Sequence, residues 1–244
     1  MKKEPIIEFK NVSKKFGDQP VLNNISFSVM ENEIFGLLGR SGAGKTTLLH
    51  ILLGLVKKDK GIILYRGQKI RPDKFFTKKK IGFAPQEASF YPKLSVQENL
   101  WYYGRMYEVK PKILEHRIIE LLRLFNLEHA RKKKASKLSG GMKRRLDLAI
   151  SLIHNPDVII LDEPTTGLDV ILSKQVWELI NRIKNAGKTV IISTHVLHEV
   201  QKNCTSIGII SEGTFYPQTD LYSFARKNNA KTLEEMFIKF FEKK

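Results

Sequence analysis

The sequence predicts an α/β fold: a core with a mostly parallel sheet, an antiparallel β subdomain on its N-terminal side, and an inserted α-helical subdomain. Three features carry this prediction. A glycine-rich loop at residues 39–46 lies between a short apolar run and a run with helical spacing. A fully apolar run, typical of a central parallel strand, occurs at 158–161, and residues 189–193 are expected to form the next central strand. From about residue 88 to 154 the apolar residues instead recur at helical spacing, which indicates an inserted helical region.

Two segments near the N-terminus, 6–12 and 21–29, alternate apolar and polar residues as half-buried antiparallel strands do. A helix over 170–186 is expected to end at Gly187, because glycine favours the left-handed conformation that follows many helices. Further strands are expected at 34–38, 61–65, 81–84, 158–161, 189–193 and 206–210, and further helices at 47–53, 96–107, 113–125, 142–153 and 232–241.

We expect a single domain of 244 residues, long enough to bury a sizeable core. Residues 1–86 and 155–230 should form the α/β core with its antiparallel part. Residues 87–154 should form the helical subdomain, and residues 231–244 a C-terminal helix. No internal repeat, low-complexity segment or long linker interrupts the chain.

The composition points to a cytoplasmic chain. Cys204 is the only cysteine, which excludes a disulfide framework and fits a reducing compartment. No stretch approaches the roughly 18 apolar residues of a membrane span. The N-terminal residues also lack the apolar region of a signal peptide.

The formal net charge of +17 lies largely in the lysine-rich and arginine-rich runs 57–58, 78–80, 131–134 and 243–244. A strongly basic chain suits an anionic membrane surface or a nucleic acid. A solvated lysine-rich surface is the plainer interpretation. No aromatic side chains are interleaved with the runs, so nucleic acid is not an expected partner, while the other two interpretations stay open.

Residues 39–46 form a complete phosphate-binding loop with the pattern G-x-x-x-x-G-K-[ST]. Its glycines allow the backbone to wrap closely around phosphates and to point N–H groups inward. Lys45 would place a charge on the β- and γ-phosphates, and Thr46 would offer a hydroxyl to Mg²⁺. A strand before the loop and a helix after it complete the expected context, so the sequence predicts a P-loop NTPase core.

Two adjacent carboxylates end the apolar strand at 158–161. Ligand sites of such sheets lie at the carboxyl ends of the strands. We expect Asp162 to hold Mg²⁺, directly or through water, and Glu163 to act as the general base that polarises the attacking water.

Two polar residues follow other strands. The amide oxygen of Gln86 could coordinate Mg²⁺ or orient water, and His195 could donate to a γ-phosphate. Taken alone, each could equally be a structural or surface residue.

The sequence Leu-Ser-Gly-Gly-Met at 138–142 forms a second candidate anion site, because its glycines precede a helix and Ser139 adds a hydroxyl donor. One nucleotide needs only one γ-phosphate site. A second site on the helical insertion makes sense if it serves a nucleotide that another subunit holds.

At these residues the chain resembles the ATP-binding cassette (ABC) family, over nearly its whole length and in the expected order. The matching motifs are the Walker A loop at 39–46, the Q-loop at Gln86, the signature at 138–142, Walker B with its catalytic glutamate at 158–163, the D-loop at 167–169, the switch histidine His195 and the adenine-stacking aromatic Phe16.

The resemblance implies that two cassettes close head to tail around two ATP molecules, each held between one Walker A loop and the partner's signature. It implies an ATPase with ATP and Mg²⁺ as cofactors, Glu163, His195 and Gln86 as catalytic residues, and Thr46, Gln86 and Asp162 as metal ligands. The nucleotide contacts implied are Phe16, Val21, Gly39, Arg40, Ser41, Gly42, Ala43, Gly44, Lys45, Thr46, Thr47 and Asp169, with Ser139, Gly140 and Gly141 contacting the ATP of the partner subunit.

Three segments resemble the ABC-2-type exporter branch: the Met-containing signature, residues 90–100, and the tail at 233–237. In this branch the membrane permease is often a separate chain, and the resemblance places its contact around residues 86–107. The chain would then be peripheral on the cytoplasmic face of the membrane. The pair could be a homodimer or a heterodimer.

Five aromatic residues in or near that contact region have two possible roles, interface or core: Phe90, Tyr91, Trp101, Tyr102 and Tyr103. The chain also departs from the branch, with Arg40 and Ser41 in place of Pro-Asn and Phe16 where Tyr is frequent. A soluble cassette ATPase that moves no solute, linked to cofactor assembly or nucleic acid, is the alternative function.

Overall fold

The computed structural model describes residues 4–71, 74–219, 226 and 232–242. The chain divides into two compact units. The first unit comprises Met1–Lys74 with Ile191–Lys244, and the second unit is Phe75–Val190. The part boundaries expected at 86, 154 and 230 stay a prediction, and the basic run 243–244 lies outside the described residues.

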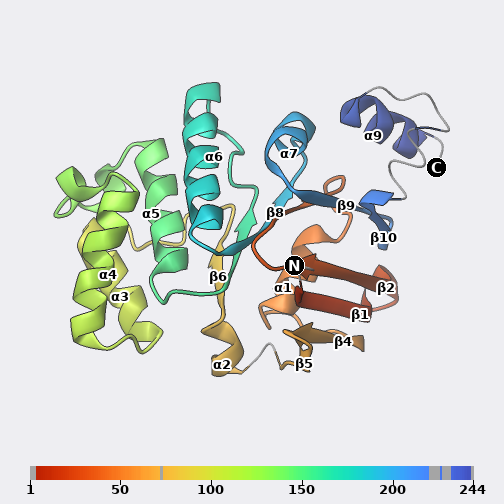
Figure 1. Cartoon of the computed structure of the whole chain (residues 1–244), viewed down its shortest axis with the longest axis horizontal. Helices are drawn as coiled ribbons and strands as arrows, with labels where there is room; N and C mark the ends of the chain where they lie inside the picture. Colours follow the sequence, from red (N-terminus) through yellow and green to blue (C-terminus); the bar gives the residue numbers. More distant parts are fainter. Residues whose placement is uncertain (1–3, 72–73, 220–225, 227–231, 243–244) are drawn as a thin grey trace. The chain divides into compact units, whose positions relative to one another are not determined.

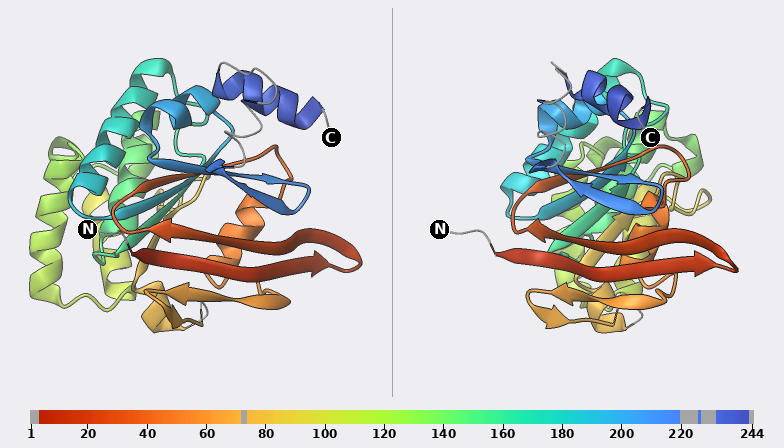
Figure 2. Two further views of the ribbon diagram at one scale, coloured as in Figure 1. Left: turned by 45° about the vertical axis from the view of Figure 1, so that its right-hand side comes forward. Right: turned by 90° about the vertical axis from the view of Figure 1, so that its right-hand side faces the viewer.

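The first unit contains an antiparallel sheet with the strand order β2-β1-β4-β5. Its strands are β1 (Pro5–Phe16), β2 (Gln19–Met30), β4 (Lys60–Tyr65) and β5 (Gln68–Lys69). β1 and β2 form the long hairpin drawn in red in Figure 2. The predicted antiparallel subdomain is confirmed, and its hairpin extends beyond the predicted strands because the polar residues 13–15 continue the pairing after the apolar alternation ends.

The first unit also contributes parallel strands, of which β8 and β9 are labelled in Figure 1. β3 (Ile34–Leu38) pairs in parallel with β9 (Ser206–Ser211), and β10 (Thr214–Pro217) runs antiparallel to β9. β8 (Thr189–Thr194) begins in the second unit and ends in the first, where the strand order is β10-β9-β3-β8. The helices of this unit are α1 (Lys45–Leu52), α7 (Leu197–Asn203) and α9 (Leu233–Glu242).

Stacked phenylalanine rings connect the two sheets of the first unit. The ring centroid of Phe27 in β2 lies 4.7 Å from that of Phe9 in β1, 5.3 Å from that of Phe35 in β3 and 4.3 Å from that of Phe215 in β10. Aromatic contacts of this kind add to the free energy gained by burial. The stack fixes β3, the strand that leads into the phosphate-binding loop.

The second unit has two parallel strands and a set of helices. β6 (Ile81–Ala84) pairs with β7 (Val158–Asp162), with Ala84 opposite Leu161. Figure 1 shows α3, α4 and α5 packed together, with α6 beside α5. The helices are α2 (Phe75–Lys78), α3 (Val96–Met106), α4 (Pro111–Leu124), α5 (Gly140–Leu152) and α6 (Val170–Asn185), with short 3₁₀ turns at Glu128–Ala130 and Ala135–Lys137.

Local sequence signals explain where these helices begin and end. α3 starts with a capping box, in which the Glu98 N–H donates to Ser95 Oγ (3.2 Å) and the Ser95 N–H donates to Glu98 Oε2 (2.7 Å). Pro111 occupies the first turn of α4, where its missing N–H costs nothing. Gly187 has φ +85° and terminates α6, as predicted. Over residues 4–71, 74–219 and 232–242, no helix is both long and apolar enough to cross a membrane.

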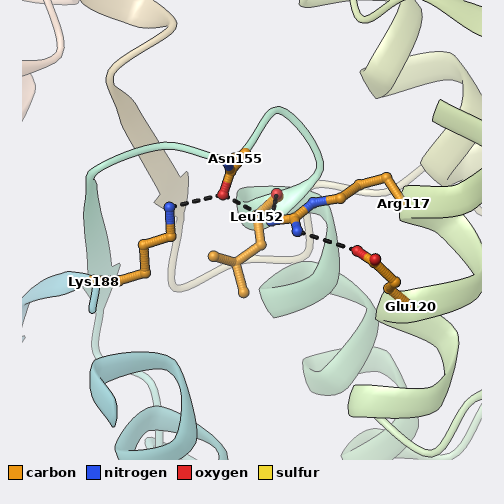
Figure 3. Close-up of polar contacts among 5 residues, drawn as sticks. All are labelled: Arg117, Glu120, Leu152, Asn155 and Lys188. Atoms are coloured by element: carbon orange, nitrogen blue, oxygen red, sulfur yellow. Dashed lines mark hydrogen bonds and ion pairs between the residues drawn. The ribbon is translucent and has the colours of Figure 1, made fainter. Parts of the chain in front are cut away.

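A polar cluster fixes the turn between α5 and β7 (Figure 3). Asn155 Oδ1 accepts hydrogen bonds from Arg117 Nη2 (3.1 Å) and Lys188 Nζ (2.7 Å). Arg117 Nη2 also donates to the carbonyl oxygen of Leu152 at 3.2 Å, and its Nη1 lies 3.4 Å from Glu120 Oε2. Arg117 therefore ties α4 to the end of α5 through the backbone carbonyl of Leu152 and the side chain of Asn155, whereas Glu120 lies on α4 itself.

His154, in the same turn, is half-buried and stacks on Tyr107 with ring centroids 3.7 Å apart. Its Nε2 lies 3.3 Å from the carbonyl oxygen of Ile81. Burial, together with the smaller effect of the positive charges of Arg117 and Lys188, lowers the pKa of His154 from 6.5 to about 4, although the hydrogen bond to the Ile81 carbonyl opposes the shift. The folded chain therefore holds this imidazole neutral at pH 7.

We expect His154 to make the fold sensitive to mild acid. Between pH 6.5 and pH 4 the unfolded chain binds more protons at this residue than the folded chain, so the free energy of unfolding falls as the pH falls. The loss should reach the order of 3 kcal/mol at pH 4. Denaturant unfolding of wild type and His154→Phe across this range measures the difference, because phenylalanine keeps the ring contact and does not titrate.

His116, an exposed histidine on α4, supplies the control. His116→Phe should keep the pH dependence of the wild type. Equal pH dependence in wild type and His154→Phe would contradict the assignment of a neutral imidazole at residue 154.

Candidate functional site

The phosphate-binding loop connects β3 to α1 in the first unit. Gly44 occupies the N-cap position of α1 with φ +102°, a conformation that favours glycine. No side chain caps this helix, and no acidic residue lies in its first turn. The loop thus presents helix N–H groups and a helix dipole to an incoming anion, which suits phosphate. The helix begins at Lys45, two residues before the predicted start.

Lys45 is buried with its ammonium on its own loop. Nζ donates to the carbonyl oxygens of Gly39 (2.8 Å) and Arg40 (3.1 Å). A Cβ added to Gly44 would lie 3.0 Å from the carbonyl oxygen of Val21, so β2 runs directly beside the loop. The structure therefore places Val21 beside Gly44, and the Lys45 ammonium on the carbonyl of Gly39.

The remaining candidates of the first unit are accessible. Phe16, near the turn of the β1–β2 hairpin, is 51% exposed, and Lys14 Nζ lies 5.1 Å from its ring centroid. Lys14 also forms an ion pair with Asp59 at 3.0 Å. Thr46 is exposed in the first turn of α1, and His195 is exposed directly after β8.

The second unit gathers the predicted hydrolytic residues at one strand edge. Asp162 is the last residue of β7 and is buried, and Glu163 follows it, half-buried. Gln86 lies two residues after β6. Because β6 and β7 are parallel neighbours, their carboxyl ends lie at the same edge. Thr166 Oγ1 donates to Glu163 Oε2 at 2.9 Å and orients the carboxylate.

The signature residues form a second helix N-terminus in this unit. Ser139 caps α5, and its Oγ accepts from the Met142 N–H at 3.4 Å. A Cβ added to Gly140 would meet nothing within 4 Å, so the approach to this helix end is open. Asp169 caps α6 through the Leu172 N–H at 2.8 Å, and a Cβ on Gly141 would lie 2.7 Å from Leu172 Cδ2. The starts of α5 and α6 are therefore in contact.

Arg144 is a buried residue near these groups that the motifs did not single out. Its guanidinium donates to backbone carbonyls next to Gln86 and Glu163. Its position five residues after Ser139, on the same helix as the signature, was the only available signal. From the sequence alone, a charged residue such as Arg144 would be assigned to the exposed face of its helix.

The aromatic residues divide between core and surface. Phe90 is buried, whereas Tyr91, Trp101 and Tyr102 are 45%, 38% and 40% exposed. Tyr103 is half-buried, with its hydroxyl donating to the carbonyl oxygen of Ser89, and burial raises its pKa to about 12. Trp101 and Tyr102 are neighbours on α3 and both are exposed, which helical spacing alone could not decide.

Known proteins share this arrangement. The sequence profile described as ABC transporter matches residues 22–166. The chain belongs to the ABC transporter family. Among its relatives is the Nod factor export ATP-binding protein I of Burkholderia lata, which is 41% identical over 207 residues, 85% of this chain and 68% of that protein. The linearmycin resistance ATP-binding protein LnrL of Bacillus subtilis is 38% identical over 221 residues, 89% of this chain and 71% of that protein.

Solved ABC structures have the same fold. The ATP-binding subunit of an ABC transporter superposes with a TM-score of 0.83 at 26% identity, covering 96% of this chain and 98% of that one. CbiO1 from Clostridium perfringens, part of the ABC transporter complex CbiONQ, gives a TM-score of 0.82 at 24% identity over 97% and 99% of the two chains. The predicted ABC family and fold class are confirmed, and this ABC chain is an ATP-binding subunit of the ATPase type.

Proposed function

We propose that this ABC chain is the ATP-hydrolysing subunit of an exporter, which dimerises around two ATP molecules and drives a separate membrane permease. The observation that carries the proposal is the presence of two helix N-termini suited to phosphate. One, at Gly44, begins α1 and the other, at Ser139, begins α5. The names of the relatives, which speak of Nod factor export and linearmycin resistance, favour transport over the soluble alternative.

ATP binding rests on the first unit. Lys45 would exchange its bonds to the loop carbonyls for the β- and γ-phosphates, and the N–H groups of the loop would surround them. Phe16 offers an exposed ring for adenine, since aromatic faces stack well on bases. Val21 would border the nucleotide from the neighbouring strand. The other nucleotide contacts proposed for residues 39–47 stay a prediction from the sequence.

Hydrolysis rests on the strand edge of the second unit and on His195. As the sequence predicts, Thr46, Gln86 and Asp162 would offer the oxygen ligands that a magnesium ion prefers. Mg²⁺, when bound, neutralises charge on the β- and γ-phosphates. Glu163 would take a proton from the attacking water, with its carboxylate held by Thr166. His195 would donate a hydrogen bond to the γ-phosphate.

A second cassette would complete each site. Ser139, Gly140 and Gly141 would bind the γ-phosphate of the ATP on the partner, and Asp169 would contact that nucleotide from the start of α6. ATP then stabilises the closed dimer because it contacts both chains, and hydrolysis removes that contact. The same argument holds for a homodimer and for a heterodimer.

The exporter role places the chain on the cytoplasmic face of a membrane, with an integral permease as its partner. Exposed Tyr91, Trp101 and Tyr102 supply a contact surface of the kind that protein interfaces favour. The rings of Tyr91 and Tyr102 meet edge to face at 4.8 Å, and the guanidinium of Arg105 lies 5.4 Å from the Trp101 centroid. Part of the +17 charge would face anionic headgroups at this location.

Removing this aromatic surface should detach the permease. We expect Trp101→Ala combined with Tyr102→Ala to weaken the complex about 30-fold, the loss typical of an interface hot spot. The measurement is recovery of the co-expressed multi-span membrane chain, identified by mass spectrometry, from detergent extracts with a tagged cassette. Hydrolysis by the isolated cassette should stay unchanged.

Ile113→Ala with Ile119→Ala is the matched control, because these two exposed apolar residues lie on α4 of the same unit. The permease should be recovered with this control variant in the same amount as with the wild type. Equal recovery by the Trp101 and Tyr102 variant would exclude this surface as the permease contact.

A further inference from the structure

Arg144, in α5, is 7% exposed, and its guanidinium makes three hydrogen bonds to backbone oxygens. Nε donates to the carbonyl of Pro164 (2.9 Å), Nη1 to that of Pro85 (2.7 Å) and Nη2 to that of Asp162 (3.3 Å). One planar group thus joins segments that follow two different strands, β6 and β7, to the helix that carries the signature.

The three carbonyls flank the proposed hydrolytic residues. Pro85 directly precedes Gln86, while Asp162 and Pro164 are the residues on either side of Glu163. Glu163 has φ +48°, a left-handed conformation that is costly for a residue with a side chain. Such a conformation persists only where its surroundings fix it. Arg144 fixes the backbone on both sides of Glu163, and Thr166 fixes its carboxylate.

Burying the guanidinium of Arg144 costs desolvation free energy, and nearby carboxylates partly offset that cost. Burial lowers the pKa of Arg144, while the carboxylates of Asp147 and Asp162 oppose the shift. Asp147 is itself buried and accepts from the N–H (2.9 Å) and the hydroxyl (2.8 Å) of Ser89. Apolar side chains would stabilise such an interior equally well, so stability alone is a weak reason to keep a buried arginine.

We propose that Arg144 is a positioning residue for hydrolysis, which holds Glu163 and the backbone before Gln86 in their working geometry from the signature helix α5. This inference rests on the proposed roles of Glu163 and Gln86. A shift of α5 when its N-terminus, residues 139–141, binds phosphate would pass through Arg144 to the base. Binding by the signature is thereby coupled to the orientation of Glu163.

The test compares Arg144→Gln and Arg144→Lys in the full chain. We expect kcat to fall on the order of 10²-fold in Arg144→Gln, because misplacing a catalytic group by about 1 Å has this effect. The kcat of Arg144→Lys should fall less, since lysine keeps the positive charge but cannot donate to three carbonyls at once. The dissociation constant for ATP should stay within about twofold of wild type, because Arg144 makes its three hydrogen bonds to residues outside the phosphate-binding loop 39–46.

Arg117→Gln is the matched control. Arg117 also donates to a backbone carbonyl, that of Leu152, and to the side chain of Asn155 within the same unit (Figure 3). Its loss should lower the unfolding temperature comparably and leave kcat unchanged. If Arg144→Gln and Arg117→Gln lower kcat equally, or if Arg144→Gln loses ATP affinity and kcat together, Arg144 is only a stabilising residue and the inference is wrong.

A double variant separates positioning from general damage. Slow hydrolysis of radiolabelled ATP by Glu163→Gln should fall far less than 10²-fold when Arg144→Gln is added, because most of the effect of Arg144 passes through the missing base. Independent, multiplicative losses would overturn the inference. Unchanged turnover in Glu163→Gln alone would instead overturn the proposed general base, so the two failures are distinguishable.

Discussion

Replacing Glu163 by Gln should reduce ATP hydrolysis on the order of 10³-fold, the usual contribution of a general base, while ATP stays bound. The amide keeps the size of the carboxylate and can still accept from Thr166 Oγ1, so the local structure should persist. It cannot take a proton from water. ATP that is bound and not hydrolysed should then hold two cassettes together, and single-turnover hydrolysis with sizing of the protein measures both effects.

Glu178→Gln provides the control for charge. Glu178 is an exposed carboxylate on α6 in the same unit, and its substitution should leave turnover at the wild-type value. Turnover by Glu163→Gln within a few-fold of wild type would show that another group activates the water.

Replacing Ser139 by Arg should reduce the rate of ATP hydrolysis by about 10²-fold or more, because a bulky cation replaces the hydroxyl at the open start of α5. At concentrations where the cassette is monomeric, ATP should still bind with wild-type affinity, since Lys45 and its loop are intact and residue 139 would contact only the ATP of a partner. Equilibrium binding of a fluorescent ATP analogue and steady-state hydrolysis separate these two quantities.

Ser136→Arg is the matched control, three residues earlier in the same exposed segment. It introduces the same charge without altering the cap of α5, and hydrolysis should continue. Full activity of Ser139→Arg, or loss of ATP affinity in that variant, would contradict a signature that acts on the nucleotide of a partner.

The elements with strong periodicity were predictable from sequence. β3 and β6 have the predicted bounds, because each apolar run follows a charged residue and is ended by Gly39 or Pro85. α7 was not predicted, since it is short and is held by packing of Val200 against residues distant in sequence, such as Met236. β10 was missed for a similar reason: Phe215 stacks on Phe27, a contact that no local pattern records.

The site was predictable as far as its motifs extend. Consecutive residues fix the phosphate-binding loop, and parallel pairing of β6 with β7 explains why Gln86 and Glu163 follow neighbouring strands. The left-handed conformation of Glu163 and the three bonds of Arg144 have no sequence signal, because they depend on carbonyls that lie 18 to 59 residues away from Arg144.

The central claim is that the signature of one chain completes the ATP site of another. The most direct measurement is the molar mass by light scattering, in Mg²⁺ and ATP, of Glu163→Gln alone and of Glu163→Gln combined with Ser139→Arg. We predict a dimer with two bound ATP for the first protein, and a monomer that still binds ATP for the second. A dimer of unchanged affinity in the second protein would contradict the account.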